Sequence, residues 1–145
     1  MGTQQTLAVM AELARMGASD PVLSNALLLE FGAPDYVLDQ IDRATRGHFR
    51  YRPEVEEIVR TPTFMWNEWQ RTGYFEGDCD DVSVMLATIA KVLEYPVRYV
   101  AIRYDDETFK HVFVEIFDGW RWRVFDPTVA PGTEYNAIER MVEPV

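Results

Sequence analysis

The chain has 145 residues, of which 48% are hydrophobic and 13% aromatic, so it can fold as one domain around a hydrophobic core. Its formal net charge of −10 argues against non-specific binding to nucleic acid or to an anionic membrane, because both need a basic face. One cysteine cannot form an internal disulfide, and one cysteine with two histidines cannot supply four such ligands to a structural zinc.

The sequence predicts neither a membrane-spanning segment nor a signal peptide. Its longest apolar runs are short, for example residues 26–29. The first residues lack the basic start and the apolar stretch of a secretory signal. We therefore expect a cytoplasmic protein, or part of an assembly built in the cytoplasm, with no nucleic-acid or membrane partner.

The first third of the chain predicts three helices. Apolar residues at helical spacing predict the first helix, which is expected to end at Gly17. Asp20 followed by Pro21 is typical of an N-cap with proline at the first helical position, and it opens a second helix that ends at Gly32. A third helix is expected over residues 35–46.

The middle of the chain predicts two more helices. Residues 48–60 show no clear pattern, and Thr61-Pro62 is expected to open a short helix after them. The next helix is the most regular, because apolar residues recur at spacings of three and four over residues 80–93. Such a helix is expected to be buried, with Cys79 just before it or in its first turn.

Three β-like runs follow, at residues 97–104, 110–117 and 120–125. Asp118-Gly119 between the second and third runs is a strong hairpin signal. The tail is expected to be a loop with a short helical turn around residues 137–141. Helices followed by an antiparallel meander predict an α+β fold.

The hairpin also predicts a contact between two polar residues. If Asp118-Gly119 is the loop, Phe117 faces Trp120, and counting back pair by pair sets His111 opposite Asp126. A four-residue loop is expected to keep this register, whereas a loop of three or five residues would put the two side chains on opposite faces. The pair lies at the far end of an otherwise apolar hairpin, which favours a site over an ordinary surface.

Cys79 is the candidate nucleophile. The unpaired N–H groups and the dipole at a helix N-terminus lower the pKa of a thiol, and a protonated His111 nearby would add to this effect. Asp126 behind His111 would fix the tautomer of the imidazole. Asp80 and Asp81 are explained as first-turn acids whose side chains need not point at the sulfur. Without such partners, a lone cysteine is usually a small buried hydrophobe.

Three motifs together resemble a known family. G-D-C-D-D at 77–81 with an apolar helix after it, H-V-F-V-E at 111–115, and Gly119-Trp120 with D-P-T at 126–128 are similar to the transglutaminase-like domain of the papain-like cysteine peptidase superfamily. The resemblance covers about residues 49–128. It implies a papain/transglutaminase-like α+β fold, with the cysteine-bearing helix packed on an antiparallel sheet. We expect a single domain over residues 1–145, with a helical lead (1–47), a catalytic core (48–128) and a C-terminal tail (129–145).

The resemblance implies a catalytic triad of Cys79 as nucleophile, His111 as general base and acid, and Asp126 as the orienting carboxylate. The implied chemistry is acyl transfer through a thioester on a peptide or protein substrate, without a cofactor. Water as acceptor gives peptide or amide hydrolysis, which we favour, and an amine acceptor gives crosslinking. Candidates for the oxyanion hole or the cleft lie upstream of the cysteine, at Trp66, Trp69 and Gln70.

Other interpretations stay open. Stand-alone domains of this size resemble bacterial and tailed-phage proteins, so the chain is alternatively a non-catalytic structural or binding component on the same scaffold, for example of a virion. Asp78, Asp80 and Asp81 lack the spacing of a calcium loop, and we expect no metal. Trp120 and Trp122 are expected on the His111 face, as core or as cleft wall.

Overall fold

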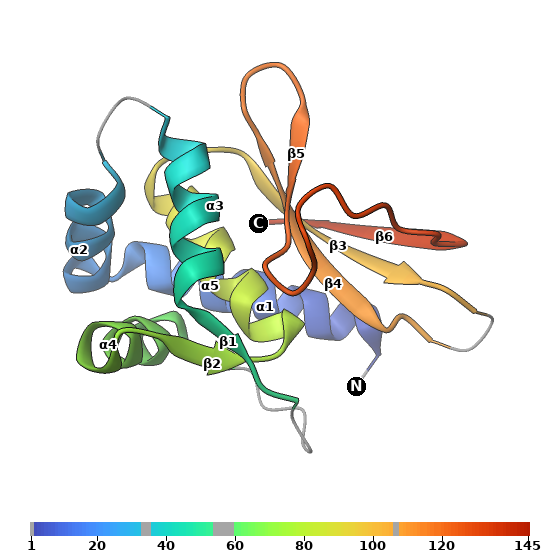
Figure 1. Cartoon of the computed structure of the whole chain (residues 1–145), viewed down its shortest axis with the longest axis horizontal. Coiled ribbons are helices and arrows are strands. Elements are labelled where there is room, and N and C mark those ends of the chain that lie inside the picture. Colours follow the sequence, from blue (N-terminus) through green and yellow to red (C-terminus); the bar gives the residue numbers. More distant parts are fainter. Residues whose placement is uncertain (1, 33–35, 54–59, 106–107) are drawn as a thin grey trace.

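The computed structural model describes residues 2–32, 36–53, 60–105 and 108–145. In this part of the chain the helices gather on one side and a four-stranded sheet lies on the other (Figure 1). The helices are α1 (Thr3–Ser19), α2 (Pro21–Phe31), α3 (Val37–His48), α4 (Pro62–Thr72) and α5 (Cys79–Val92). The strands are β1 (Phe49–Tyr51), β2 (Phe75–Gly77), β3 (Val97–Arg103), β4 (His111–Phe117), β5 (Trp122–Phe125) and β6 (Glu139–Pro144). None of these helices is both long and apolar enough to cross a membrane.

Local capping signals place most of the helix starts. Asp20 caps α2 as predicted, since its side chain accepts hydrogen bonds from the backbone N–H groups of Val22 and Leu23 at 2.9 and 3.3 Å. Thr61 caps α4 in the same way, through the N–H of Phe64 at 3.2 Å. α3 runs two residues later than predicted at its C-terminal end, and the predicted start at Asp35 falls outside the described residues.

The predicted end of the first helix at Gly17 is wrong, because α1 continues to Ser19. Gly17 is a packing residue: a Cβ atom there would lie 2.9 Å from Cγ of Pro62, at the start of α4. The glycine therefore lets α1 and α4 approach closely rather than stopping the helix.

α5 is the buried centre of the fold. Its residues from Asp81 to Ala90 are all buried, which confirms the helix predicted over residues 80–93. It packs against α1 and against the face of the sheet that carries Val112, Val114 and Ile116. A smaller apolar cluster of Val100, Ile102 and Phe113 covers the opposite face. Cys79 at the first position of α5 thus lies at one end of the main core.

The four-stranded sheet has the order β5-β4-β3-β6, and every neighbouring pair is antiparallel. Together with the helices, this arrangement confirms the α+β fold class. The helical turn predicted around residues 137–141 is wrong, because residues 139–144 form β6 along the free edge of β3. The pairing places Met141 opposite Ala101, and Arg103 binds Glu139 through a short ion pair. Hydrogen bonds to β3 therefore override the weak local helical pattern.

The segment without a clear sequence pattern contributes a small parallel sheet. β1 pairs with β2, with Tyr51 opposite Gly77, and the N–H of Arg52 donates to the carbonyl of Gly77 at 2.8 Å. Because Cys79 follows β2 after one intervening residue, this pairing brings Tyr51 beside the start of α5.

Candidate active site

The N-terminus of α5 is capped by Asp78, directly before the cysteine. Oδ1 of Asp78 accepts hydrogen bonds from the N–H groups of Asp80 and Asp81 at 3.0 and 3.3 Å. Asp81 reaches back, and its Oδ2 accepts from the N–H of Asp78 at 3.0 Å. The reciprocal bonds form a capping box around the backbone of Cys79. As the first helical residue, Cys79 has an N–H for which the helix itself provides no acceptor.

Asp81 is fully buried beneath this cap. Its carboxylate accepts from the N–H of Arg60 at 2.9 Å and pairs with the Arg60 guanidinium at 3.1 Å. A Cβ atom on Gly77 would lie 2.5 Å from Oδ2 of Asp81, so only glycine fits at this position. Asp81, the last aspartate of the G-D-C-D-D motif, is therefore a structural anchor that holds the start of the cysteine helix.

The surroundings of Cys79 shift the thiol pKa in the opposite direction from the one predicted. Burial, followed by the carboxylate of Asp80, raises its pKa to about 12, and only the backbone N–H of Val112 in β4 lowers it appreciably. Oδ1 of Asp80 lies 3.9 Å from Sγ, so this side chain does point at the sulfur. The prediction of a lowered thiol pKa is wrong, because burial and nearby negative charge outweigh the helix terminus. The resting thiol is protonated at neutral pH.

His111 and Asp126 are in direct contact, with Nε2 of the imidazole 2.6 Å from Oδ2 of the carboxylate. The predicted register is nevertheless wrong by two residues, because Phe117 faces Trp122 rather than Trp120. The expectation that a four-residue loop would keep the predicted register is wrong as well, since the loop begins only after Phe117. Residues 118–121 form a four-residue loop in which the Asp118 side chain accepts from the N–H groups of Trp120 and Arg121 at 2.8 and 2.9 Å. A shift of two keeps side chains on the same face, so His111 reaches Asp126 diagonally.

Asp126 is almost completely buried and accepts four hydrogen bonds. Thr128 donates to Oδ1 through its N–H at 3.1 Å and its hydroxyl at 2.6 Å, while His111 and the Tyr135 hydroxyl both donate to Oδ2. Burial raises the pKa of Asp126, but the bonds from His111, Thr128 and Tyr135 outweigh it and hold the pKa below its usual value. An ionised acceptor at Nε2 places the imidazole proton on that nitrogen and leaves Nδ1 as the basic one.

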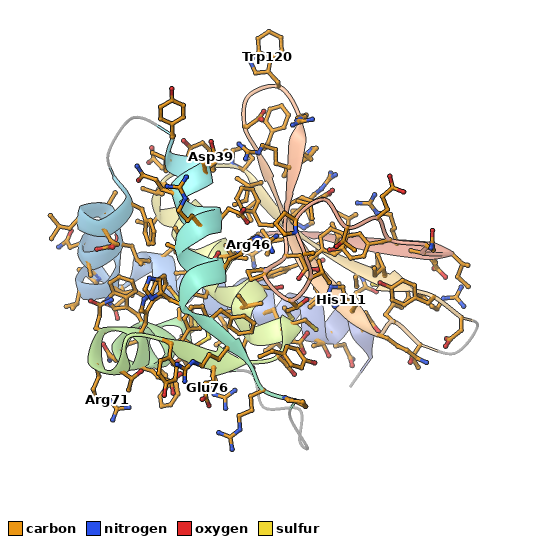
Figure 2. All side chains as sticks on the ribbon, viewed as in Figure 1. Asp39, Arg46, Arg71, Glu76, His111 and Trp120 are labelled. Atoms are coloured by element: carbon orange, nitrogen blue, oxygen red, sulfur yellow. The ribbon has the colours of Figure 1, made fainter. Side chains whose placement is uncertain are left out.

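Two cavities meet at His111. A cavity of about 370 Å³ is lined by both Cys79 and His111, together with residues of α1, β1 and the α5 cap. A second cavity, of about 310 Å³, lies against Tyr104 and Thr128. His111 and Tyr51 line both of them. His111 is labelled at the start of β4 in Figure 2, whereas Trp120 projects from the β4–β5 loop and is 93% exposed. The expectation that Trp120 forms core or cleft wall is therefore wrong.

The upstream aromatic candidates lie elsewhere. Trp66 and Trp69 are buried in a cluster of rings, in which Trp69 stacks on Phe75 with ring centroids 5.1 Å apart. Gln70 is exposed on α4. Among the described residues, none of these three lines either cavity that contains His111. The helical period of α4 turns its tryptophans into the core.

Two residues of this site lacked a strong sequence signal. Thr128 could have been found from the D-P-T motif, because a threonine two residues after an aspartate commonly donates to it in a tight turn. Tyr135 gave no signal, since it comes from the loop between β5 and β6. In the part of the chain that the structure describes, no three carboxylate, imidazole or thiol groups converge as metal ligands.

A helical layer packed on an antiparallel sheet, with a cysteine at the first position of the buried helix α5, is the arrangement of a papain/transglutaminase-like α+β fold. A family model of the transglutaminase-like superfamily matches residues 33–127, and the chain belongs to this superfamily. The fold is similar to the crystal structure of a putative cysteine protease from Cytophaga hutchinsonii, with a TM-score of 0.58 and 19% sequence identity over 77% of this chain. The chain spans 38% of that protein's length. No match was found among the curated proteins.

Proposed function

We propose that the protein is a cysteine-dependent acyl-transfer enzyme, in which Cys79 is the nucleophile, His111 the general base and acid, and Asp126 the orienting carboxylate. The observation that carries this proposal is the contact of His111 Nε2 with the buried Asp126, beside a cavity that Cys79 also lines. This arrangement leaves Nδ1 of His111 available as the base. Membership of the transglutaminase-like superfamily supports the same chemistry.

The high pKa of the thiol determines how the first step proceeds. Because the thiol is protonated at rest, Nδ1 of His111 accepts the proton as sulfur attacks the carbonyl carbon of the acyl donor. We propose the N–H of Cys79, for which the helix provides no acceptor, as one donor to the oxyanion that forms. The imidazolium then protonates the leaving amine, which departs as the thioester forms. Trp66, Trp69 and Gln70 have no assigned part in these steps.

The acceptor in the second step decides the reaction type. With water, His111 takes a proton from the attacking molecule and returns it to the thiol, which completes hydrolysis of a peptide or amide. With an amine, the same steps produce a new amide bond. We propose hydrolysis as the main reaction, because water needs no binding site of its own.

A second candidate function is supported by one specific observation. A thiol with a pKa of about 12, next to Asp80, is a poor resting nucleophile, which favours a non-catalytic binding or structural component on the same scaffold. Incorporation into a virion is one form that this role could take.

An acylation experiment separates the two functions. The wild-type protein, Cys79→Ser and His111→Ala are each mixed with p-nitrophenyl acetate at pH 7.5, while nitrophenol release is followed and the acetylated residue is located by mass spectrometry. The enzyme acetylates Cys79 and turns over, and His111→Ala slows acetylation by about 10²-fold or more. Equal acetylation rates in wild type and His111→Ala would overturn the catalytic proposal and leave the structural one.

A further inference from the structure

Tyr135 touches two members of the proposed triad at once. Its hydroxyl donates to Oδ2 of Asp126, the same oxygen that accepts from His111. Its ring stacks against the imidazole of His111, with centroids 5.9 Å apart and an interplanar angle of 30°. Both contacts come from one side chain that neither the sequence motifs nor the proposed steps include.

We propose that Tyr135 is a positioning residue, which locks the carboxylate of Asp126 and the imidazole plane of His111 in a single orientation. The proposal rests on the proposed function, because it concerns the same histidine and aspartate. Tyr135 acts through these two groups and takes no part in the bond-making steps itself.

The side chain of Tyr135 is itself held rigidly. Its ring lies almost parallel to that of Phe113, with centroids 4.7 Å apart and an interplanar angle of 7°, above the small apolar cluster on the outer face of the sheet. The loop that carries it is tied to α3, since Nη1 of Arg46 donates to the carbonyl of Val129 at 2.6 Å. A further bond from Thr133 to the carbonyl of Ala130 folds the loop on itself. A rigid support is what a positioning role requires.

The two contacts restrain different motions. Thr128 holds only Oδ1 of Asp126, so Tyr135 supplies the second restraint, at the oxygen that faces His111. The stacked ring opposes rotation of the imidazole, which would break the contact between Nε2 and Asp126. Since the base must present Nδ1, loss of either contact weakens the productive geometry.

Tyr135 remains the donor and Asp126 the acceptor of their hydrogen bond near neutral pH. Burial, followed by the bond to Asp126, raises the pKa of the Tyr135 phenol, while the pKa of Asp126 lies below its usual value. The phenol therefore stays a donor and the carboxylate an acceptor. The other titratable or charged groups that face this cluster are His111, Cys79, Tyr104 and Arg46.

Tyr135→Phe tests the hydrogen bond while keeping the ring, and Tyr36→Phe, at an exposed and remote tyrosine, is the matched control. Nuclear magnetic resonance of the free protein reports the Asp126 carboxyl titration and the solvent exchange of the His111 Nε2 proton. His48, the other histidine of the chain, serves as an internal reference. In Tyr135→Phe we expect the Asp126 pKa to rise toward its usual value and the His111 proton to exchange faster, with both unchanged in Tyr36→Phe.

The rate of Cys79 acetylation completes the test. Loss of one hydrogen bond to a charged group predicts about a tenfold slower rate in Tyr135→Phe, and Tyr135→Leu, which also removes the stacking, should be slower still. Unchanged Asp126 titration, proton exchange and acetylation in Tyr135→Phe would overturn the positioning role. If the two resonance signals respond but wild-type Cys79 is never acetylated, the restraint stands and the enzyme proposal fails. Thermal unfolding of each variant identifies losses that come from misfolding.

Discussion

Two buried aspartates, Asp81 and Asp126, lie on either side of the candidate site and have opposite ionisation behaviour. Both are at most 2% exposed and both accept several hydrogen bonds. Burial raises the pKa of Asp81 to about 6, with negative Asp78 beside it, whereas the bonds from His111, Thr128 and Tyr135 hold the pKa of Asp126 below its usual value. Equal burial therefore has different consequences, and the neighbouring groups decide which form is stable.

The two aspartates also belong to two different parts of the site, one around Cys79 and the other around His111. Asp81 belongs to a local cap that fixes the backbone around Cys79, in a region dense in carboxylates. Asp126 belongs to a network assembled from β4, the end of β5 and the loop that carries Tyr135. The proposed nucleophile thus lies in the part that is rich in carboxylates, and the proposed base lies in the part where the buried carboxylate of Asp126 contacts His111.

Removal of the Asp126 charge should have the largest effect. Asp126→Asn presents an amide to His111 and Tyr135, so the imidazole loses the acceptor that keeps its proton on Nε2. We expect Cys79 acetylation to slow by about 10²- to 10⁴-fold. Asp39→Asn, which removes an exposed carboxylate paired with Arg123, is the control and should leave the rate unchanged. A rate for Asp126→Asn within a factor of three of wild type would contradict the orienting role (about 0.6 kcal/mol).

A methyl group at Gly77 should disrupt the cap of α5, which Asp78 and Asp81 form around Cys79. Gly77→Ala places Cβ against Oδ2 of Asp81, and we expect a loss of about 1–3 kcal/mol in the free energy of unfolding, measured in urea. Gly47→Ala in α3 is the matched control, because a Cβ atom there meets nothing within 4 Å. That substitution should keep or slightly raise stability. Equal stability of the two variants would show that the start of α5 tolerates displacement of Asp81.

Asp81 and Asp126 should make the free energy of unfolding depend on pH in opposite directions. Asp81 has a folded pKa of about 6, above that of the unfolded chain, so its contribution is most favourable at low pH and is lost as the pH rises through about 4 to 6. The lowered pKa of Asp126 contributes stability that is present above the unfolded pKa and lost as the pH falls.

Urea unfolding between pH 3 and 7 tests this assignment, because Asp126 should affect the slope mainly below about pH 4 and Asp81 between about pH 4 and 6. Asp81→Asn removes the group whose contribution to the free energy of unfolding decreases as the pH rises. The substitution can also change stability by an amount that does not depend on pH. The free energy of unfolding of the variant, relative to wild type, should therefore increase as the pH rises. Asp126→Asn should change the slope in the other direction. Parallel curves for Asp81→Asn and wild type would disprove the raised pKa of Asp81.

A smaller effect is expected from the carboxylate nearest the thiol. Asp80→Asn removes a charge whose oxygen lies 3.9 Å from Sγ, which should lower the thiol pKa and speed alkylation by iodoacetamide at pH 8 severalfold. Burial, the larger cause, remains, so the thiol should not become a resting thiolate. Asp39→Asn again serves as the control. An unchanged or slower alkylation rate would mean that Asp80 does not suppress the thiolate.

Local signals predicted the helices of this fold well. Asp20-Pro21, Thr61-Pro62 and the apolar period after Asp80 depend on neighbours within a few residues, and the structure has helices at each of these positions. β6 and the β1–β2 pair escaped prediction because their hydrogen bonds join segments distant in sequence. The hairpin register was wrong by two residues because the Asp118 side chain stabilises a loop at residues 118–121, which leaves Phe117 paired with Trp122.

The candidate site was predicted in part for the same reason. The motifs supplied Cys79, His111 and Asp126, and the two-residue period of a strand was enough to put the last two on one face. The direction of the thiol pKa depends on burial and on which way Asp80 turns, and neither follows from spacing. Tyr135 reaches the site through contacts distant in sequence, since Arg46 binds its loop and Phe113 stacks on its ring.

The wall that α1 contributes to the larger cavity separates the shape of that cavity from the groups beside it. Thr3, Thr6 and Leu7 line the same cavity as Cys79 and His111, yet they lie outside residues 33–127, which the superfamily model matches. One wall of this cavity is therefore supplied by a helix that the superfamily model does not match. In the proposed enzyme, a substitution at Thr3 or Thr6 would reshape the space beside Cys79 and His111 without altering either of them.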